Sequence, residues 1–338
     1  MKDLLRELCL INGISGDETA VREYIIEKVK DCCEYRTDNL GNLICFKKGK
    51  KSSDKKVMIA AHMDEVGFIV TSIRSDGTLL FGTVGGVDAS VAIGRQVTVG
   101  RKGISGVIGS TAVHNLSKEA REKSPEISSL YVDIGAADKA EAEKYVSLGD
   151  SICFDSEYIE FGSGRIKSKA IDDRAGCAIM IKLMHEEIEY DTFFIFNVQE
   201  EIGLRGSTVS AYSVKPDIAI VLEATTAADI DGADGAKKVC SIGEGPVVSF
   251  MDRSTVYDKG LYRLAFDTAA QENIKCQTKT MIAGGNDSGA IHLSGSGVRT
   301  LAVSVPCRYL HSPSCVIGYS DLEDMYRLVK SLTSKVAE

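Results

Sequence analysis

Short apolar runs separated by segments of helical spacing restrict the fold of this chain more than any other feature. The runs Lys56–His62, Thr192–Val198 and Asp217–Leu222 are almost wholly apolar, as in strands that helices bury on both faces. The segments Asp173–Glu187 and Tyr319–Ala337 carry apolar residues at helical intervals. Strands that alternate with helices indicate an α/β protein with a mostly parallel sheet flanked by helices. Two further strands are expected at Leu261–Phe266 and Arg299–Val305.

The first 33 residues are predicted to form two helices. Met1–Leu10 has apolar residues at helical spacing, and Asp17–Cys33 carries a longer apolar stripe. Ser15 is followed three residues later by Glu18, which is the spacing of a capping box. The stretch Ser15–Glu18 is therefore expected to begin the second helix.

Residues 70–164 differ in composition and pattern from the rest of the chain. They are rich in Gly, Val and Thr, with short runs of alternating apolar and polar residues between Gly-rich turns. This pattern is typical of a small β-barrel or sandwich. We therefore expect an α/β domain of residues 1–69 plus 165–338, interrupted by an inserted all-β domain of residues 70–164. The expected strands are Gly67–Ile73, Thr78–Phe81, Val91–Val99, Gly103–Ile108, Ser129–Ile134 and Ser151–Phe154.

Composition excludes several classes of partner. The net charge is −8, whereas nucleic-acid binding needs clustered Lys and Arg. No apolar run approaches the ~18–20 residues that span a bilayer. The ten cysteines form no CxxC pair, and no cationic and apolar leader opens the chain. We expect a cytoplasmic protein with reduced thiols, no nucleic-acid partner and no membrane.

Histidines and carboxylates concentrate at the ends of the predicted strands and at the start of one predicted helix. Ligands bind beyond the carboxyl ends of strands in open α/β sheets, so these side chains are expected to meet there. Clustered carboxylates repel one another, and cations relieve that repulsion. Imidazole with carboxylate suits Zn, Co or Mn. The residues are His62, Asp64, Asp172, Glu200, Glu201, Glu223 and His311.

Each of these residues also has an ordinary structural interpretation when it is taken alone. An Asp before a helix, such as Asp172, is typical of an N-cap. A Glu pair such as Glu200–Glu201 is typical of a solvated loop. His311, two residues before Pro313, is typical of a turn. Their joint placement at strand ends favours the metal site.

Several sequence blocks resemble the signature blocks of the glutamyl and deblocking aminopeptidase family M42, also called the tetrahedral aminopeptidases, some of whose members carry an endoglucanase label. As a set in this order, the blocks are highly specific for the family. The resemblance covers nearly the whole chain. The blocks are Ala61–Phe68 (AHMDEVGF), Ala170–Gly176 (AIDDRAG), Gln199–Gly206 (QEEIGLRG), Glu223–Asp229 (EATTAAD) and Tyr309–Pro313 (YLHSP).

The resemblance implies a zinc-peptidase-like fold and a site for two divalent metal ions, Zn, Co or Mn. Asp172 would bridge both ions through its carboxylate. The peptide bond between Asp172 and Asp173 is expected to be cis. Glu200 would be the general base, and Asp64 would orient a histidine ligand. The implied ligand set is His62 and Glu223 on one metal ion, and Glu201 and His311 on the other, with Asp172 shared.

The resemblance also implies a substrate and an assembly. The loop that contains Gly284, Gly285 and Asn286 is similar to a substrate-binding loop of the family, although a flexible turn is an equally good interpretation. The inserted domain resembles a dimerisation module, and similar enzymes form homo-oligomers up to dodecamers that admit short peptides. The implied activity is hydrolysis of amino-terminal residues from peptides.

Two other functions stay open at this point. A glycoside hydrolase would use two carboxylates as acid and as nucleophile or base, but sugar sites usually present Trp, and this chain has none. A non-catalytic metal-binding assembly protein would keep the metal site without turnover.

Overall fold

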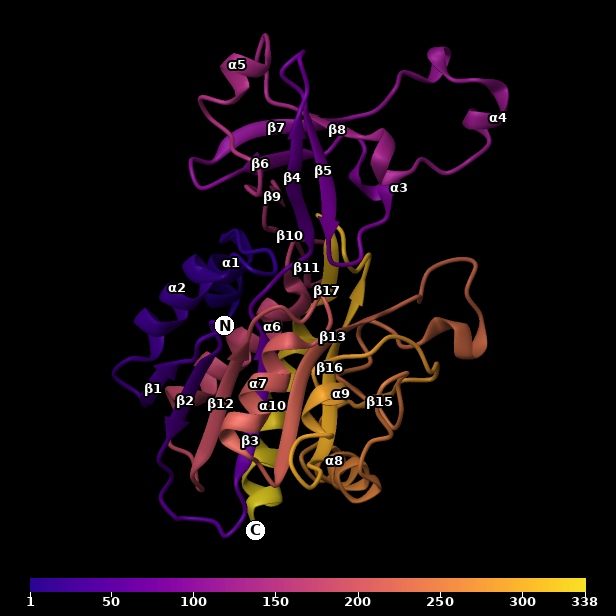
Figure 1. Ribbon diagram of the computed structural model, residues 1–338. Helices are drawn as coiled ribbons and strands as arrows, with labels where there is room; N and C mark the ends of the chain where they lie inside the picture. Colours follow the sequence, from indigo (N-terminus) through magenta and orange to yellow (C-terminus); the bar gives the residue numbers. More distant parts are fainter.

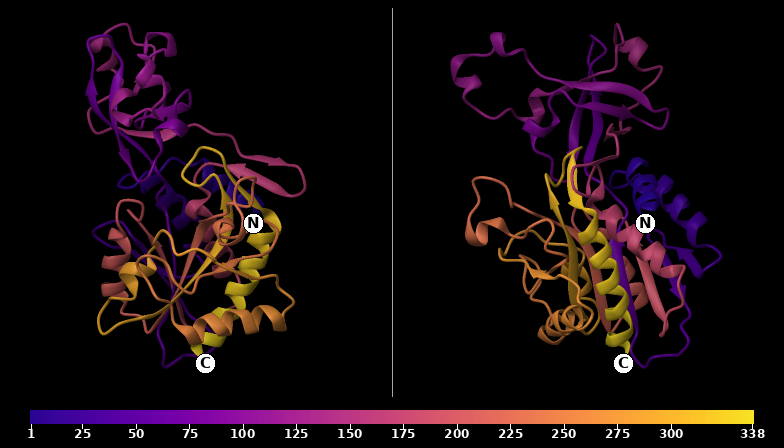
Figure 2. Two further views of the ribbon diagram at one scale, coloured as in Figure 1. Left: turned by 90° about the vertical axis from the view of Figure 1, so that its right-hand side faces the viewer. Right: turned by 180° about the vertical axis from the view of Figure 1, so that it is seen from behind.

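A computed structural model describes residues 1–338, apart from the side chains of Glu119, Ala120 and Ala236. The chain forms an α/β body with a β-barrel set above it, as Figure 1 shows. In both views of Figure 2 the barrel projects from one end of the α/β body. Among the described residues, no helix combines the length and the apolarity needed to cross a membrane.

The large sheet is mixed, so the expectation of a mostly parallel sheet is wrong. The four central strands β12, β3, β13 and β16 run parallel to one another, and the short strands β14 and β15 form one further parallel pair. The outer strands pair antiparallel, because hairpins such as β1–β2 and β10–β11 join neighbours that follow each other closely in the chain. The strand order is β1 (Glu34–Thr37), β2 (Leu43–Lys47), β12 (Thr192–Asn197), β3 (Val57–His62), β13 (Ile218–Thr226), β16 (Arg299–Arg308), β17 (Cys315–Gly318), β11 (Arg165–Ser168) and β10 (Ile159–Phe161). Off this order, β14 (Val247–Val248) pairs with β16, and β15 (Gln277–Thr278) pairs with β14.

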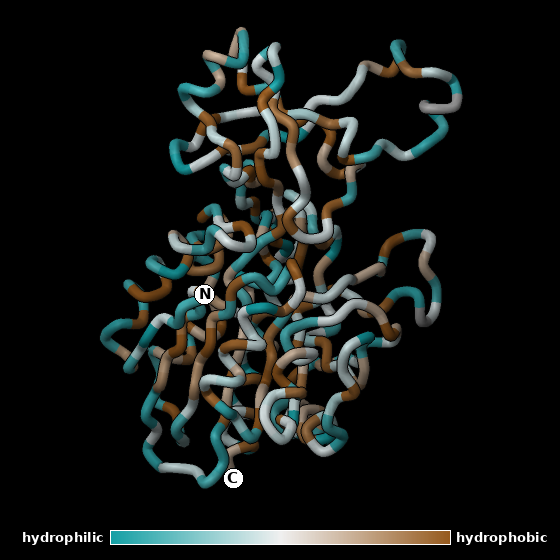
Figure 3. The backbone as a smooth tube through the Cα atoms, viewed as in Figure 1, coloured by the Kyte–Doolittle hydropathy of each residue, from teal (hydrophilic) through white to brown (hydrophobic). Residues whose placement is uncertain are grey.

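Helices cover both faces of this sheet, and side chains alternate between the two faces along each central strand. On β3, Ile59 packs into one buried cluster and Met58 and Ala60 into another. Figure 3 shows hydrophobic residues along the central strands and hydrophilic residues on the outer loops. One face packs on α1 (Lys2–Leu10), α2 (Thr19–Val29), α6 (Ile171–Met184), α8 (Lys259–Gln271) and α10 (Tyr319–Ala337), and the other on α7 (Arg205–Val214) and α9 (Ser288–Ile291).

The inserted region forms a closed six-stranded barrel around its own core. Phe68 contacts the rings of Phe81 and Phe154 inside it, at centroid distances of 4.8 and 5.3 Å. The barrel strands are β4 (Gly67–Ile73), β5 (Leu79–Val84), β8 (Tyr131–Asp133), β7 (Ile104–Gly109), β6 (Gln96–Val99) and β9 (Ser151–Phe154); β10, within the range 70–164 expected for the insertion, pairs in the large sheet. Short helices are α3 (Ala89–Ala92), α4 (Lys118–Arg121), α5 (Lys139–Ala142), η1 (Val113–Asn115), η2 (Ile127–Ser129) and, outside the barrel, η3 (Gly235–Lys238).

Three local predictions are wrong. The expected strand Val91–Val99 begins inside helix α3 (Ala89–Ala92), and strand β6 starts only at Gln96. The expected strand Leu261–Phe266 lies inside helix α8, where Asp258 caps the helix by accepting a hydrogen bond from the Leu261 amide at 2.8 Å. A short apolar run does not distinguish a strand from a buried helix. The capping box at Ser15 and Glu18 does not form either, because helix α2 begins at Thr19 without a side-chain cap.

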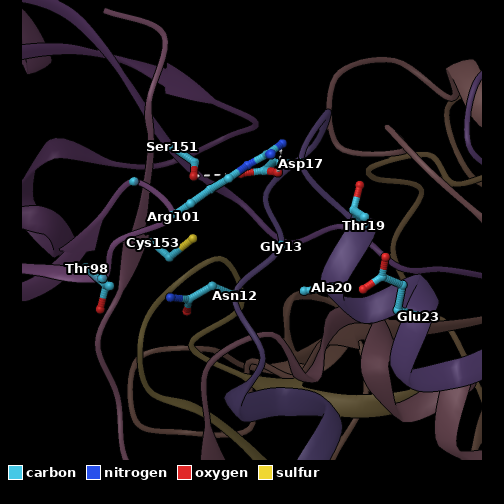
Figure 4. A pocket seen from close by; sticks show the side chains of 12 residues that line it. Asn12, Gly13, Asp17, Thr19, Ala20, Glu23, Thr98, Arg101, Ser151 and Cys153 are labelled. Carbon is cyan, nitrogen blue, oxygen red and sulfur yellow. Dashed lines mark hydrogen bonds and ion pairs between the residues drawn. The ribbon is translucent and has the colours of Figure 1, made fainter. Parts of the chain in front are cut away.

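The barrel and the α/β body meet at the segment that joins α1 to α2. There the Ser151 hydroxyl of β9 donates to Asp17 Oδ2 at 2.9 Å, the bond that Figure 4 marks. A cavity of about 480 Å³ opens beside this bond, and its walls come from both bodies, including Asn12 and Thr19 on one side and Thr98 and Arg101 on the other.

Arg174 is the largest fully buried side chain and links α6 to the amino-terminal segment. Its guanidinium donates to the carbonyls of Met63 at 2.7 Å, Leu8 at 2.6 Å, Ile11 at 3.2 Å and Gly13 at 3.4 Å. The Leu8 and Gly13 carbonyls also accept from the Ile11 and Glu65 amides, so the guanidinium adds its donors to bonds that the backbone already makes.

The substitution Arg174→Met should therefore destabilise the protein strongly. Loss of the guanidinium removes its hydrogen bonds to buried carbonyls and its ion pair with buried Glu65, and we expect the free energy of unfolding to fall by ~3–5 kcal/mol. Thermal unfolding followed by circular dichroism measures the effect. The exposed Arg6 on α1 offers the control, since Arg6→Met should change stability by less than ~0.5 kcal/mol. Equal melting temperatures for the two variants would contradict this account.

Candidate metal centre

The predicted site residues lie together above the carboxyl ends of the central parallel strands. His62 ends β3, Glu200 and Glu201 follow β12, and His311 follows β16. Glu223 does not follow its strand as expected, because β13 continues to Thr226. It nevertheless reaches the site, since pairing between β13 and β3 stops at Val221 and Ala60 while β13 runs on beside the end of β3.

The first group of candidate ligands is His62, Asp172 and Glu223. His62 Nε2 lies 3.3 Å from Asp172 Oδ1 and 3.7 Å from Glu223 Oε2. His62 Nδ1 lies 3.0 Å from the Asp64 carbonyl oxygen and 3.5 Å from its carboxylate Oδ1. A proton held on Nδ1 by Asp64 leaves Nε2 free to bind a cation.

The second group is Asp172, Glu201 and His311. His311 Nε2 lies 3.6 Å from Asp172 Oδ2 and 3.5 Å from Glu201 Oε2. His311 Nδ1 lies 2.9 Å from the carbonyl oxygen of Gly86, which belongs to the turn after barrel strand β5. The barrel domain therefore orients one of the candidate ligands.

Asp172 joins the two groups, with one carboxylate oxygen toward each histidine. Its backbone departs from helical geometry at the start of α6, and Ala170 just before it has a φ of 55°. The Asp172–Asp173 peptide is cis, as the resemblance implied. Asp173 points elsewhere: its Oδ1 accepts a hydrogen bond from the Gly176 amide at 2.8 Å.

The electrostatics of the cluster fit bound cations. Burial raises the pKa of Glu201 to about 7 and that of Glu223 to about 8. Burial lowers the pKa of His311, but Asp172 and Glu201 outweigh it and raise that pKa to about 9. Buried Glu223 Oε1 has no hydrogen-bond partner. Excess carboxylate, paired histidines and an unpartnered oxygen are what divalent cations would satisfy.

The ligand atoms are close enough together to share ions. Among the described residues, the atoms of His62, Asp172 and Glu223 lie within 4.8 Å of one another, as do those of Asp172, Glu201 and His311. The donors of each group, one imidazole and two carboxylates, suit Zn or Mn. A third group, His62 with Glu200 and Glu201, meets the same limit.

Asp64 lies beneath the two glutamates. Its fully buried carboxylate accepts hydrogen bonds from the Glu200 amide at 3.0 Å and the Glu201 amide at 3.1 Å. Asp64 therefore contacts the backbone of the Glu pair as well as His62, which is more than the orienting role expected for it.

A cavity of about 440 Å³ opens over the ligand cluster. The predicted substrate-binding residues Gly284, Gly285 and Asn286 line it. Gly284 has a φ of 67°, which suits glycine, and a Cβ on Gly285 would lie 2.9 Å from the Ser254 hydroxyl. The cavity thus connects the predicted substrate loop to the candidate metal ligands.

Sequence reasoning missed several residues that support the site. Gly86 contacts His311 through its backbone carbonyl, and a backbone contact leaves no side-chain motif in the sequence. Lys279, which lines the cavity, stands in a segment without a recognisable pattern. Ser15 and Glu18 were assigned to helix capping, although Ser15 donates to Asp64 Oδ2 at 2.6 Å.

The chain belongs to the M42 glutamyl aminopeptidase family, whose model matches residues 41–328. A protein of Acetivibrio thermocellus is 41% identical over 97% of this chain and 97% of its own length. The glutamyl aminopeptidase of Lactococcus lactis is 32% identical over 99% of this chain and 98% of its own. The lysyl aminopeptidase of Pyrococcus furiosus is 31% identical, with 99% and 97% covered.

Solved structures agree with this family assignment. The aminopeptidase APDkam598 of Desulfurococcus kamchatkensis has a TM-score of 0.94 at 33% identity, with 98% of this chain and 94% of that chain covered. The TET1 peptidase of Pyrococcus horikoshii, described as assembling into a tetrahedron or an octahedral shell, has a TM-score of 0.87 at 32% identity, with 98% of each chain covered. A Thermotoga maritima structure named endoglucanase has a TM-score of 0.81 at 37% identity, with 99% of each covered.

Proposed function

We propose that this protein is a metal-dependent aminopeptidase that removes the first residue from short peptides. Two divalent cations per subunit, Zn, Co or Mn, would be held by His62, Asp172, Glu201, Glu223 and His311. The observation that carries the proposal is the shared position of Asp172, whose two oxygens face His62 at 3.3 Å and His311 at 3.6 Å. Family membership supports the same activity.

The proposed chemistry divides between the cations and the protein. Bound cations would polarise the scissile carbonyl and make a water more acidic. Glu200 lines the cavity, and burial raises its pKa well above the ordinary value, as suits a general base. Glu200 would take the proton of the attacking water and deliver it to the leaving amine. Gly284, Gly285 and Asn286 would position the peptide backbone against the ligand cluster.

The direct test is a panel of aminoacyl-p-nitroanilides assayed after chelation and after the addition of Zn²⁺, Co²⁺ or Mn²⁺. The proposal expects that chelation abolishes hydrolysis and that at least one metal restores it. Full activity in the chelated protein, or no hydrolysis with any metal, would remove the proposal.

The endoglucanase name of one structural neighbour keeps a glycoside hydrolase as the alternative. Paired carboxylates serve such enzymes without a metal, so this alternative predicts cellulose hydrolysis that survives chelation. The absence of Trp from the chain disfavours it. A non-catalytic assembly protein would instead bind metal ions and hydrolyse neither substrate.

Lys279 suggests a preference for an acidic first residue. Among the cavity-lining residues that the structure describes, it is the one Lys or Arg. Its Nζ donates to the Ala283 carbonyl at 2.7 Å, which leaves two further donors for a substrate carboxylate. A half-buried cation in the wall of the same cavity would pair with the side chain of a Glu or Asp substrate.

The substitution Lys279→Met should therefore lower kcat/KM for glutamyl-p-nitroanilide at least ~10-fold, a loss of about 1.4 kcal/mol. The value for leucyl-p-nitroanilide should stay within ~3-fold of the original. The exposed Lys275, which does not line the cavity, gives the control Lys275→Met. An equal loss on both substrates would assign Lys279 to loop structure only.

The assembly is proposed from the relatives and from the barrel surface. The barrel exposes large apolar side chains, including Val107 at 45%, Val113 at 67% and Leu148 at 66%. Apolar side chains of this kind mark a contact surface where they are contiguous, so the main support for assembly is the TET1 structure, which is described as assembling into a tetrahedron or an octahedral shell. We expect a homo-oligomer built from barrel contacts; a monomeric mass by light scattering would contradict it.

A further inference from the structure

The backbone that presents Glu200 and Glu201 is held in an unusual conformation. Gln199, directly before them, has a φ of 56°, in the left-handed region that non-glycine residues rarely occupy. Such a conformation persists only when surrounding contacts enforce it. The contacts on the amides of residues 199–201 therefore decide where both glutamates point.

Two carboxylates hold these three amides. Glu18 Oε1 accepts from the Gln199 amide at 3.1 Å. The two carboxylate oxygens of Asp64 accept from the Glu200 amide at 3.0 Å and from the Glu201 amide at 3.1 Å. Asp64 follows strand β3, whereas Glu18 comes from the segment between α1 and α2, far from this loop in sequence.

Residues 12–18, here called the strap, also hold Asp64 itself. The Ser15 hydroxyl donates to Asp64 Oδ2 at 2.6 Å. Glu18 and Ser15 are both buried, with 4% and 8% of their surface exposed. The two residues of the expected capping box therefore make contacts outside their own helix. Ser15 donates to Asp64, which holds the Glu200 and Glu201 amides, and Glu18 accepts from the Gln199 amide.

The strap is anchored along its length, so it is a fixed support. The Gly13 amide donates to Glu65 Oε1 at 3.1 Å, and the Glu65 amide returns a bond to the Gly13 carbonyl at 2.9 Å. Glu18 Oε1 also accepts from the Gly16 amide at 2.7 Å. Asp17 accepts from Ser151 of the barrel, as Figure 4 shows. The Glu18 carboxylate that accepts from the Gln199 amide is therefore itself held by the strap.

We propose that Glu18 and Ser15 are positioning residues for the reaction, because they fix the backbone from which Glu200 and Glu201 reach the metal centre. This inference rests on the proposed function for its kinetic readout, and on the metal site alone for its binding readout. Neither residue lines the cavity over the ligand cluster, so neither touches the substrate.

The test compares two substitutions at Glu18. Glu18→Met preserves the length of the side chain and removes the acceptor, whereas Glu18→Gln retains a carbonyl oxygen that can accept both amides. We expect kcat to fall ~10–100-fold in Glu18→Met, with KM within ~2-fold, and the affinity for the more weakly held cation to fall by a similar factor. Glu18→Gln should recover both quantities to within ~3-fold. Titration calorimetry with Zn²⁺ supplies the affinity.

A matched control separates positioning from loss of stability. Asp321 is another buried carboxylate that accepts two amides, from Gly243 at 2.8 Å and Gly245 at 2.9 Å, and none of these three residues lines the cavity over the ligand cluster. Asp321→Leu should lower the melting temperature while kcat per folded molecule and Zn²⁺ affinity stay unchanged. Ser15→Ala, a milder change, should lower kcat several-fold and covers the case in which Glu18→Met does not fold.

The outcomes are distinct from those that test the proposed function. If the parent protein hydrolyses no peptide substrate, the aminopeptidase proposal fails, and the Zn²⁺ affinities of the Glu18 variants still decide the positioning role. Unchanged kcat and affinity in folded Glu18→Met, or an equal loss in Glu18→Gln, would overturn that role. Unchanged kcat and affinity in Ser15→Ala would overturn it for Ser15.

Discussion

Replacing Glu200 by glutamine should reduce kcat by ~10²–10⁴-fold, a loss of about 3–5 kcal/mol of transition-state stabilisation. Glutamine has nearly the same shape but cannot accept the proton of the attacking water. The backbone bond from residue 200 to Asp64 Oδ1 does not involve the side chain and should persist. We therefore expect KM to change little, because the cavity keeps its shape.

Metal content decides how the loss is interpreted. Glu200 is not in either group that shares Asp172, although it meets His62 and Glu201 in the third group. Elemental analysis of Glu200→Gln should still find two ions per chain. A metal-loaded variant with unchanged kcat would exclude Glu200 as the base, and a variant without metal would make it a ligand instead.

The substitution Asp172→Asn should remove activity by acting on both cations at once. Asp172 is the residue common to the two ligand groups, and His311 and His62 together outweigh burial and hold the pKa of its carboxyl well below the ordinary value. An amide lacks the negative charge that the two proposed cations would share. Substituting a residue that hydrogen-bonds to a metal ligand typically lowers metal affinity ~10–100-fold. Because Asp172 is itself a proposed ligand, we expect the affinity for both ions to fall by more than that. Zinc analysis after dialysis measures it.

Two comparisons complete this experiment. His62→Ala should lose one ion and keep the second, because His62 belongs to one of the two groups that share Asp172. Asp258→Asn, at the cap of α8, should keep both ions and the activity. Retention of two ions by Asp172→Asn would show that no carboxylate is shared and would require a different ligand arrangement.

Much of the architecture followed from periodicity, because hydrophobic burial depends on it directly. The runs at Lys56–His62 and Thr192–Val198 became central strands β3 and β12, and the predicted barrel strands closed into one barrel. The strand expected at Leu261–Phe266 was wrong because a short, largely apolar run fits either geometry, and only packing against α10 and the sheet selected the helix α8. The direction of the outer strands depended on hairpins that periodicity does not reveal.

The amino-acid sequence by itself determined which side chains stand at the strand ends, since chain order and strand period place His62 and Glu201 there, and it identified the family through its blocks. Only the tertiary structure decided that the Gly86 carbonyl of the barrel contacts His311, and that Ser15 and Glu18 hydrogen-bond to Asp64 and to the Gln199 amide. Those contacts join residues distant in the chain through single hydrogen bonds, and a hydrogen bond leaves no periodic trace in a sequence.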